Sequence, residues 1–464
     1  MNATVDVTVI GGGISGLAAA WYLRRAGLSV RLLERGSQPG GTIGTIEDGG
    51  WRIEQGPNSA LETTPLFGAM FDALGIAGER LYADPAAERR YILRGGKLHA
   101  LPMSPGAFLG SSLWTARGKL RLLKEPLVGR AAQEETVAQF VERRLGREFL
   151  DYAINPFVAG VYAGDPSRLS VRAAFPKLYA LEERYGGLIR GMIGGARERR
   201  RRAETAKDRA KMFSFRSGMQ TLPRALASAL GSAAEFGAEG ESIVPQGETL
   251  MVRYRRGGES LALASRAAVI AVPAHAAGPL VRPLSADAAD ALGSIAYPPV
   301  TEVFLGFPLE AIARPLDGFG FLVPEKEQRS ILGTIWSSAL FPGRAPAHHA
   351  ALTTFVGGSR QPAIAALDDD ALVRGVTGEL RAVMGVQGEP VYTRICRWET
   401  AIPQYAIGHL DLMRRLDRCE EQIPGLYFCG NYRGGIALGD CLVSAEALAR
   451  RVAASVLQSH HQQS

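Results

Sequence analysis

The first forty residues contain two short apolar runs separated by a glycine cluster. Residues 5–10 are mostly β-branched and apolar, which is typical of a buried parallel strand. A helix is expected from about Ile14, and Gly27 ends it. A second strand is expected from residue 29 and ends in Glu34. This order of strand, turn, helix and strand predicts the first unit of a Rossmann-like α/β domain.

The pattern changes twice along the rest of the chain. Residues 104–211 show few strand-like alternations and are predicted to be largely helical. Strands return after Met212, and their apolar or alternating runs cover residues 250–254, 261–265, 268–273, 303–307, 320–323, 331–336 and 352–356. The third run is expected to carry the chain back under the nucleotide domain, and the last four to form an antiparallel substrate-binding sheet. Residues 425–431 predict a strand and a turn before a helix that reaches about Leu457, so the nucleotide domain is expected to use both ends of the chain.

Length and composition indicate a globular protein of about three domain-sized units. The chain has 464 residues, 46% of them apolar, and its 55 glycines exceed the usual share. The net charge is +7, but residues 197–211 alone hold eight basic and three acidic side chains. A nucleic-acid surface would spread its basic residues among aromatic ones, so an anionic membrane surface is the better candidate partner. An exposed helix or linker is the alternative interpretation of this run.

Neither a metal centre nor a disulfide framework is expected. The four cysteines lie far apart without a CxxC pair, and His348 and His349 lie in a proline- and alanine-rich segment that is expected to face solvent. The N-terminus lacks a basic leader and a cleavage site, and no uncharged apolar run reaches the roughly 18 residues of a spanning helix. A reducing, cytoplasmic location is therefore expected, with any membrane contact made from one side.

One helical segment combines bulky apolar residues with cations. Residues 107–124 include Trp114, Lys119 and Lys124 among several leucines. This composition suits a monotopic segment whose apolar face enters lipid while its cations meet headgroups. An ordinary helix with one face on the core and one in solvent gives the same pattern, so both interpretations stay open.

Gly11, Gly13 and Gly16 form a GxGxxG motif between the first strand and its helix. Gly11 permits the tight turn, Gly13 lets the backbone approach a pyrophosphate, and Gly16 lets helix and strand pack closely. The start of the helix supplies N–H donors to the phosphates. Glu34, 18 residues after Gly16, is placed to accept hydrogen bonds from a ribose, and its charge disfavours the 2′-phosphate of NADP.

One further feature favours FAD over NAD, and another indicates where the electrons go. Residues 40–42 (GGT) resemble the glycine doublet that follows the ribose-binding acid in many flavoproteins with two dinucleotide sites. No second strand–GxGxxG–helix unit follows, because residues 318–320 (GFG) lack the third glycine. Electrons are therefore expected to leave to oxygen or a quinone. The strand, turn and helix after residue 425 are expected to close the site over the flavin ring.

Four segments resemble one family, the FAD-dependent protoporphyrinogen oxidases of haem biosynthesis, within the amine oxidase and phytoene desaturase superfamily. They are residues 54–59 (EQGPNS), 160–166 (GVYAGDP), 332–338 (LGTIWSS) with Phe341-Pro342, and 435–441. The second segment is the most discriminating, because the Rossmann unit is shared by the whole superfamily. The resemblance covers essentially the whole chain.

The resemblance implies a reaction and a domain plan. The reaction is the oxygen-dependent oxidation of protoporphyrinogen IX to protoporphyrin IX, in which hydride passes to FAD and O2 becomes H2O2. The fold is α/β, with a Rossmann-like FAD-binding domain, an α+β substrate domain and an all-α membrane-binding domain. In this plan residues 1–90, 212–290 and 395–464 bind FAD, residues 91–103 and 291–394 bind substrate, and residues 104–211 contact the inner face of the cell membrane.

The same resemblance assigns site residues. FAD contacts fall on Gly11, Gly13, Ile14, Ser15, Gly16, Glu34, Arg35, Gly40, Gly41, Thr42, Gly56, Pro57, Asn58, Ser59, Val244, Trp398, Gly430, Ile436, Ala437 and Leu438. The sequence around Val244 is loop-like. The tetrapyrrole cavity is assigned to Gly160, Gly164, Leu332 and Phe341, and Arg90 is assigned to a substrate propionate.

Asn58 and Arg90 are the two polar residues expected to act on the substrate. A flat apolar macrocycle with carboxylate arms calls for apolar walls and an arginine that can bind a carboxylate with two hydrogen bonds. No strong base is needed, because the flavin accepts hydride. Asn58 stands where the family sometimes has an arginine, so anchoring is expected to fall on Arg90. A structural turn after Pro57 and a surface cation are the alternative interpretations of the two residues.

Other functions fit parts of the same pattern. A coproporphyrinogen III oxidase of the same family is expected to have a more basic pocket and a more soluble chain. An amine oxidase or carotenoid desaturase would share both ends of the chain but not the GVYAGDP segment. A non-catalytic carrier of prenylated proteins shares the fold, but the intact GxGxxG motif with Glu34 favours a flavoenzyme. A homodimer is compatible with the sequence, which does not define the oligomeric state.

Overall fold

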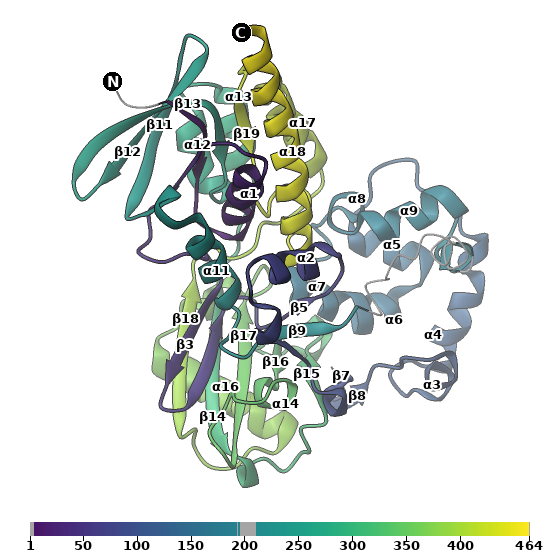
Figure 1. The fold of residues 1–464 in the computed structure, drawn as a ribbon. Coiled ribbons are helices and arrows are strands. Elements are labelled where there is room, and N and C mark those ends of the chain that lie inside the picture. Colours follow the sequence, from purple (N-terminus) through teal and green to yellow (C-terminus); the bar gives the residue numbers. More distant parts are fainter. Residues whose placement is uncertain (1–3, 193, 195–209, 464) are drawn as a thin grey trace.

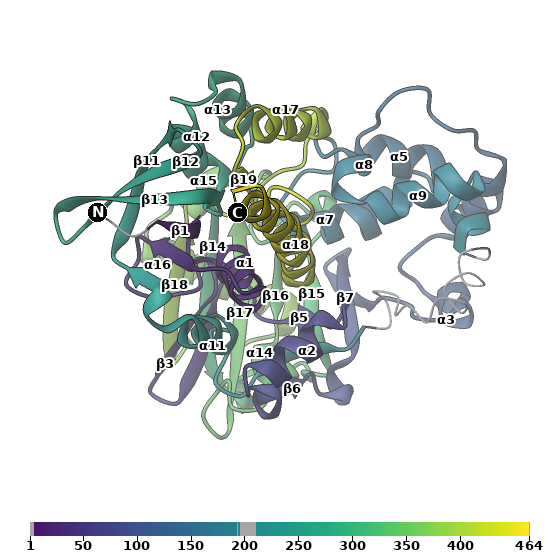
Figure 2. The ribbon, with the colours of Figure 1, turned by 45° about the horizontal axis from the view of Figure 1, so that its top comes forward.

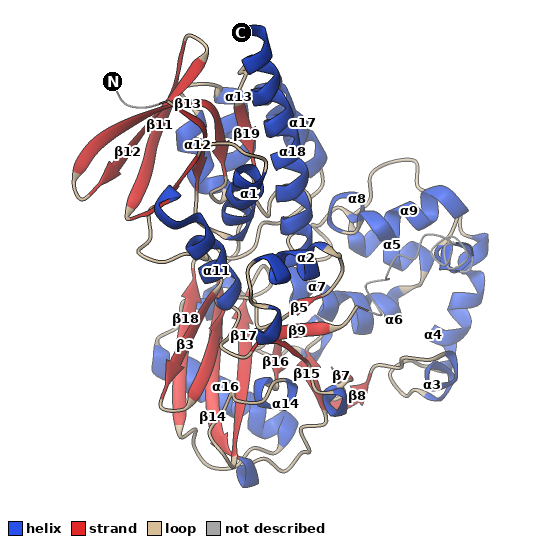
Figure 3. Ribbon diagram, viewed as in Figure 1, coloured by secondary structure: helices blue, strands red, loops and turns tan. Residues whose placement is uncertain are grey.

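The computed structural model describes residues 4–192, 194 and 210–463 (Figure 1). Two β-rich regions lie one above the other in this view, and a group of helices lies to one side (Figure 3). Most of the basic run of residues 197–211 lies outside the described residues. Within the described part of the chain, none of the helices has the length and apolar content needed to span a bilayer.

The first sheet contains the predicted strand–turn–helix–strand unit. Its strands lie in the order β10–β2–β1–β13–β12–β11, and β19 pairs with β13. Their bounds are β1 Val5–Ile10, β2 Val30–Glu34, β10 Ala234–Phe236, β11 Ala238–Gln246, β12 Thr249–Arg256, β13 Glu259–Ile270 and β19 Leu426–Phe428. Parallel pairing joins β10, β2, β1, β13 and β19, whereas β11 and β12 pair antiparallel with each other and β12 with β13.

Helices cover both faces of this sheet. The helices α1 (Ile14–Arg25) and α18 (Leu438–Gln463) lie side by side on one face (Figures 1 and 2). The same face is also covered by α2 (Leu66–Ala73) and α11 (Thr221–Leu230). The other face is covered by α12 (Ala274–Val281), α13 (Ala286–Gly293) and α17 (His409–Gln422). Because both faces are covered, the central strands are apolar on both sides, which explains the run of apolar residues in β1.

One predicted pair of strands is wrong, because the structure has a single strand there. β13 runs without a break through residues 261–265 and 268–270, and Pro273 lies beyond it as the N-cap of α12. The apolar run is interrupted at Ser265 and Arg266, where pairing changes from antiparallel with β12 to parallel with β1 and β19. The loop-like stretch around Val244 is also a strand, since Val244 lies in β11.

The second sheet has the order β18–β14–β17–β16–β15–β7–β8. Its bounds are β7 Arg89–Arg94, β8 Lys97–Ala100, β14 Val300–Pro308, β15 Gly318–Leu322, β16 Gly333–Ile335, β17 His349–Gly357 and β18 Tyr392–Trp398. The four predicted strands between residues 303 and 356 are confirmed, but the sheet is not purely antiparallel, because β7 runs parallel to β15. β18 crosses the predicted domain boundary at residue 395, and α16 (Asp369–Met384) covers one face.

The expected helical region is present. Along the chain it lies between the strands β1 and β2 and the remaining strands of the first sheet. Its elements are α3 Pro105–Gly110, α4 Ala116–Arg121, η3 Leu122–Leu127, α5 Val137–Arg144, α6 Arg147–Phe149, η4 Leu150–Ile154, α7 Asn155–Tyr162, α8 Val171–Ala174 and α9 Pro176–Tyr185. Trp114 is buried and stacks on Phe149 with ring centroids 4.7 Å apart, so it belongs to the core of these helices and not to an exposed apolar face. Buried Arg144 forms ion pairs with Glu125 (2.9 Å) and Glu182.

Small elements join the larger units. They are β3 Gly44–Asp48, β4 Trp51–Gln55, β5 Ala60–Leu61, β6 Arg80–Tyr82, β9 Met212–Phe215, α14 Ser337–Leu340, α15 Pro362–Ala365 and the short 3-10 turns η1 Ala77–Glu79, η2 Pro85–Ala87, η5 Gly231–Ala233, η6 Leu309–Ala311 and η7 Glu325–Glu327. The hairpin of β3 and β4 packs on the second sheet through Trp51 and Phe304. The loop after β4 therefore starts beside the second sheet, where the Gly56 N–H contacts Glu302.

Candidate functional site

The GxGxxG turn is closed on one side and open on the other. Gly11 has a φ of +114°, and a Cβ placed there would lie 2.7 Å from the carbonyl oxygen of Ala271. A Cβ at Gly16 would lie 2.0 Å from the Gly11 carbonyl oxygen. At Gly13, by contrast, a Cβ would have no atom within 4 Å. The free space in front of Gly13 is where a pyrophosphate would approach the first N–H groups of α1, so the loop fits a dinucleotide.

The glycine doublet lies directly against this loop. The Gly40 N–H donates to the Gly12 carbonyl oxygen (2.9 Å), and Gly41, with a φ of +62°, places its hypothetical Cβ 3.2 Å from the Gly13 Cα. Thr42 follows on the surface, and its carbonyl oxygen lies 2.1 Å from a Cβ built on Gly56. The three predicted FAD-binding segments around residues 13, 41 and 56 are therefore neighbours in space.

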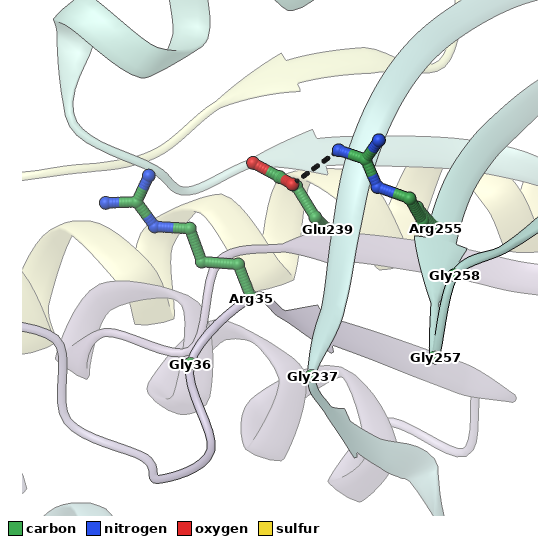
Figure 4. Close-up of a pocket in the computed structure, with 7 residues that line it drawn as sticks. All are labelled: Arg35, Gly36, Gly237, Glu239, Arg255, Gly257 and Gly258. Atoms are coloured by element: carbon green, nitrogen blue, oxygen red, sulfur yellow. Dashed lines mark hydrogen bonds and ion pairs between the residues drawn. The ribbon is translucent and has the colours of Figure 1, made fainter.

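Glu34 lies at the end of β2, where its carboxylate faces the glycine turn. Its Oε2 accepts the Gly12 N–H (2.6 Å) and its Oε1 accepts the Gly36 N–H (2.7 Å). Arg35 is exposed beside it and lines a surface pocket of about 590 Å³ with Gly237, Glu239 and Arg255 among its other residues. Figure 4 shows the Glu239 carboxylate between the two guanidinium groups, and its ion pair with Arg255 measures 3.0 Å. The carboxyl end of β2 thus offers an acid for a ribose and a basic rim.

The C-terminal segment closes the other end of the loop. Gly430 follows β19, and the Cys429 thiol contacts the Ser15 carbonyl oxygen of α1. Leu438 packs on the core shared by α1 and α18, and Ile436 packs on the helical region. Ala437 lies between them, and the Cys441 N–H donates to its carbonyl oxygen (2.9 Å). The predicted contacts of residues 430–438 therefore lie where the nucleotide sheet meets the helices.

Tyr405 fixes this C-terminal segment from outside. Its hydroxyl donates to the Asn431 carbonyl oxygen (2.6 Å) and accepts the Gly435 N–H (3.0 Å). Its ring stacks on His409, whose Nε2 lies 2.9 Å from the Tyr432 carbonyl oxygen. The neighbouring Gln404 donates to the Tyr162 carbonyl oxygen (2.8 Å) within the GVYAGDP segment. Two sequence motifs that lie more than 260 residues apart are thus held together by side chains that sequence reasoning missed.

The loop after β4 is tied to the second sheet by one buried carboxyl. The Gly56 N–H (2.8 Å) and the Trp398 indole N–H (2.9 Å) both donate to Oε1 of Glu302 on β14. Burial raises the pKa of Glu302 to about 8, against the opposing effect of these two donors. Trp398, a predicted FAD contact, is thereby joined to the predicted segment of Gly56, Pro57, Asn58 and Ser59. Glu302 was not predicted, although a lone acid in the apolar strand VTEVFLGF is a signal that could have found it.

Asn58 lies in a small cavity whose polar wall is a buried ion pair. Arg344 Nη1 lies 2.7 Å from Glu54 Oε1, both side chains are almost fully buried, and Phe341 lines the same cavity. The Asn58 amide donates to the Gly56 carbonyl oxygen (3.2 Å), two residues earlier. This local hydrogen bond is the contact that a structural turn would make. Asn58 therefore stabilises the turn after Gly56 and also lines the cavity.

The remaining predicted substrate residues lie on the same face of the second sheet, because Arg90 pairs through Gly320 with Ile335, which lines the Asn58 cavity. A Cβ at Gly160 would lie 2.7 Å from Leu322 Cδ2, and Leu322 pairs in register with Ile92 of β7. Arg90, two residues before Ile92, lies on the same face of β7, is exposed, and has no ion-pair partner among the described side chains. Its neighbour Arg89 points the other way and pairs with Asp317 (2.6 Å).

Leu332 packs with Ala159 and Ala163 around Gly160, and a Cβ at Gly164 would lie 2.6 Å from Gln404 Oε1. The structure therefore brings Gly160, Gly164 and Leu332 together and places Phe341 with Asn58 in a separate cavity. Phe341 is 2% exposed and belongs to a cluster with Leu340 and Ala87. Val244 is 44% exposed on β11 and pairs with Met251 of β12, in the first sheet.

The described residues contain no cluster of three or more His, Cys, Asp or Glu side chains that could hold a metal ion. His348 is exposed and His349 is partly exposed. All four cysteines are unpaired thiols. The chemical groups that converge on the open turn are backbone N–H donors, Glu34 and apolar walls, which fit a flavin dinucleotide and an apolar substrate.

Comparison with known proteins extends over nearly the whole chain. Residues 14–453 match the family described as flavin containing amine oxidoreductases. The chloroplastic protoporphyrinogen oxidase of Oryza sativa subsp. japonica is 36% identical over 97% of this chain and 88% of its own length. The coproporphyrinogen III oxidase of Bacillus subtilis (strain 168) is 28% identical over 95% of this chain and 96% of its own length.

Solved structures share the fold. A candidate protoporphyrinogen oxidase from Exiguobacterium sp. 255-15 superimposes with a TM-score of 0.80 at 23% identity, covering 98% of this chain and 99% of the other. The cyclohexylamine oxidase of Brevibacterium oxydans IH-35A gives a TM-score of 0.71 at 18% identity, covering 98% of this chain and 100% of the other. These likenesses define a mixed α/β flavoprotein architecture.

Proposed function

The chain belongs to the flavin-containing amine oxidoreductases, as an FAD-dependent oxidoreductase of the protoporphyrinogen oxidase type, and on this premise we propose that it oxidises protoporphyrinogen IX to protoporphyrin IX. The observation that carries the proposal is the likeness to chloroplastic and mitochondrial protoporphyrinogen oxidases, two of which are 36% and 33% identical over 97% and 94% of this chain. Bound FAD, held by the glycine turn and Glu34, would supply a hydride acceptor for the porphyrinogen, with O2 as the final electron acceptor and H2O2 as its product.

The chain's own residues supply binding and orientation. The N–H groups at the start of α1 and the open space at Gly13 would receive the pyrophosphate. Glu34 would accept the ribose hydroxyls on the lone pairs that the Gly12 and Gly36 N–H groups leave free. Glu302 holds the segment of Gly56 and Trp398 in one position. Because hydride leaves to the cofactor, the protein needs to exclude water and hold the macrocycle, and no side chain has to act as a strong base.

Arg90 is the proposed anchor for a substrate propionate. It is exposed and unpaired in the described structure, on the face of β7 that continues through Ile92 and Leu322 to Gly160. A guanidinium without a carboxylate partner is available to a carboxylate ligand, which it can bind with two parallel hydrogen bonds. Gly160, Gly164 and Leu332 form the apolar wall next to it in this proposal.

The test offers protoporphyrinogen IX and coproporphyrinogen III separately to the FAD-loaded protein under anaerobic conditions, then admits air and follows porphyrin fluorescence and peroxide. We expect a higher kcat/KM with protoporphyrinogen IX. Preference for coproporphyrinogen III would support the second candidate function, which the relative from Bacillus subtilis favours. A purified protein without flavin absorption would contradict both.

We also propose that residues 103–127 contact the inner face of a cell membrane from one side. Their exposed leucines and methionine are Met103, Leu109, Leu120, Leu123 and Leu127, which are 63–84% exposed. Lys124 lies among them and is exposed. Exposed apolar residues bordered by cations suit a monotopic surface. The replacement of Leu120, Leu123 and Leu127 by Ser should lower recovery with anionic vesicles, while the replacement of Leu309, an exposed leucine on η6, by Ser should not.

A further inference from the structure

The second sheet contains a buried carboxyl, that of Glu302, with one oxygen that has no role in the proposed function. Glu302 lies near the start of β14 and is 4% exposed. On the neighbouring strands it stands opposite Cys396 of β18 and Phe355 of β17. Burying an acid in such surroundings is costly unless it is neutral or well partnered. A structural strand would be more stable with an apolar residue here, so the acid needs an explanation.

The two oxygens of this carboxyl are used unequally. Oε1 accepts two hydrogen bonds, from the Gly56 N–H and the Trp398 indole. Oε2 is buried and has no hydrogen-bond partner in the described structure. A buried polar atom without a hydrogen-bond partner lowers the stability of a protein by roughly 1–3 kcal/mol, so such atoms are rare in protein interiors. Oε2 therefore has capacity for a group that the protein alone does not supply.

We propose that Glu302 is a positioning residue of the FAD site that acts in its neutral form: Oε1 joins Gly56 to Trp398, and Oε2 holds a proton that is available to the bound cofactor. The proposal rests on the proposed function, because Gly56 and Trp398 are assigned to FAD by family resemblance. It goes further by naming a proton-holding atom on the second sheet, which the sequence pattern did not single out.

The surroundings of Glu302 favour the neutral acid. Burial raises its pKa to about 8, and the negative charge of Glu54 acts in the same direction. The Cys396 thiol opposite it has a pKa raised to about 11 by burial and stays neutral at the same pH. Glu54 is held by Arg344, and the Gly56 and Trp398 donors are the groups that lower the pKa of Glu302. The carboxyl is therefore mostly protonated at pH 7 and charged above about pH 8.

Deprotonation should weaken FAD binding. Both the pyrophosphate and the reduced flavin carry negative charge, and a carboxylate in a low-dielectric site repels them. We expect FAD release, measured as flavin fluorescence after dilution of the FAD-loaded full chain, to give a constant Kd up to about pH 7.5. The Kd should then rise by up to about tenfold per pH unit above the transition, with a matching change in the visible flavin spectrum.

Glu302→Gln keeps an oxygen acceptor for both N–H groups and puts an uncharged donor in place of the protonated Oε2. Its Kd should stay near the neutral-pH value of the unchanged protein and be flat from pH 6.5 to 9.5. Trp398→Phe removes a donor that stabilises the charged form, so the transition should move to higher pH. Thr301→Val on the same strand, which loses a buried hydrogen bond to Ala365, should reduce stability but keep the pH transition.

A pH-independent Kd and spectrum in the unchanged FAD-loaded protein would overturn the proposal, and so would a transition that survives in Glu302→Gln. If the Gln variant does not fold, the pH dependence of the FAD Kd in the unchanged protein and in Trp398→Phe still tests the proposal. A protein that binds no FAD, or binds it without oxidising either porphyrinogen, fails the proposed function and not this inference alone.

Discussion

The glycine turn and the buried acid of the second sheet, which we propose to serve one ligand, are built in different ways. In the turn, the decisive contacts join Gly11 to Gly16 and Gly12 to Glu34, all within 23 residues of one another. In the second sheet, Glu302 contacts Gly56 across 246 residues and Trp398 across 96. The first arrangement is built from backbone shape and the second from a buried acid. Variants that affect one and spare the other can therefore test this difference.

The largest effect is expected at the buried ion pair. Arg344→Met removes the partner of Glu54, and Arg344 also donates to Ser214 Oγ (2.6 Å). Breaking a buried pair leaves an uncompensated charge and costs about 3–5 kcal/mol in free energy of unfolding. Urea unfolding of the FAD-loaded protein measures this loss of stability. Asp317→Asn removes the exposed pair with Arg89 and should cost less than about 1 kcal/mol; equal losses would show that Arg344 is not held as described.

Two glycine substitutions should separate folding from FAD binding. Gly16→Ala places a Cβ 2.0 Å from a backbone oxygen, so α1 must move away from β1, at an expected cost of about 3 kcal/mol. Gly13→Ala finds open space in the protein and should leave its stability within about 0.5 kcal/mol, but the methyl group enters the space meant for pyrophosphate. Thermal unfolding and FAD Kd together test this pair. A stable Gly16→Ala protein would show that the turn is less tightly packed than described.

The contact between the C-terminal segment and the helical region should lose stability in acid, because His409 lies buried there. Burial lowers the pKa of His409 from its ordinary value to about 4, so the folded protein keeps this imidazole neutral while the unfolded chain takes up a proton near pH 6.5. Its contribution is complete above pH 6.5 and is lost as the pH falls, by roughly 2 kcal/mol at pH 5. His409→Gln should remove this part of the pH dependence, which urea unfolding at pH 7.5 and pH 5 would reveal. An unchanged difference between the two pH values would assign it to other groups.

The smallest effect is expected on substrate affinity. Arg90→Ala should raise KM for the porphyrinogen about tenfold, about 1.4 kcal/mol, while FAD content and stability stay unchanged, because Arg90 has no partner to lose among the described residues. Arg89→Ala is the matched control, since this side chain faces Asp317 on the other side of the strand. Equal KM values for both variants would remove Arg90 from the substrate site.

Sequence patterns predicted the first region well because its physics is local. The strand, the glycine spacing, the helix and the acid at residue 34 each follow from neighbours in the chain, and the structure places them as expected. The two errors, at β13 and around Val244, arose where a strand changes its pairing partner or faces solvent. Neither change of partner nor exposure can be read from periodicity alone.

In the second sheet, the sequence predicted the positions of the strands but not which side chains they bring together. The sequence gives the positions of β14 to β17, and family resemblance adds a list of site residues. It does not tell that Phe341 and Asn58 share a cavity apart from Gly160, or that Trp114 is buried against Phe149. Those facts depend on which faces meet when distant strands pair.

The amino-acid sequence by itself determined the class of protein: a glycine turn, a ribose-binding acid and the family segments identify an FAD-dependent oxidoreductase, and the comparisons confirm it. Only the tertiary structure decided which side chains hold the site together. Glu302, Gln404 and Tyr405 gain their roles from partners far along the chain. The physical reason is that backbone conformation is set by near neighbours, whereas burial and charge pairing are set by whatever the fold brings into contact.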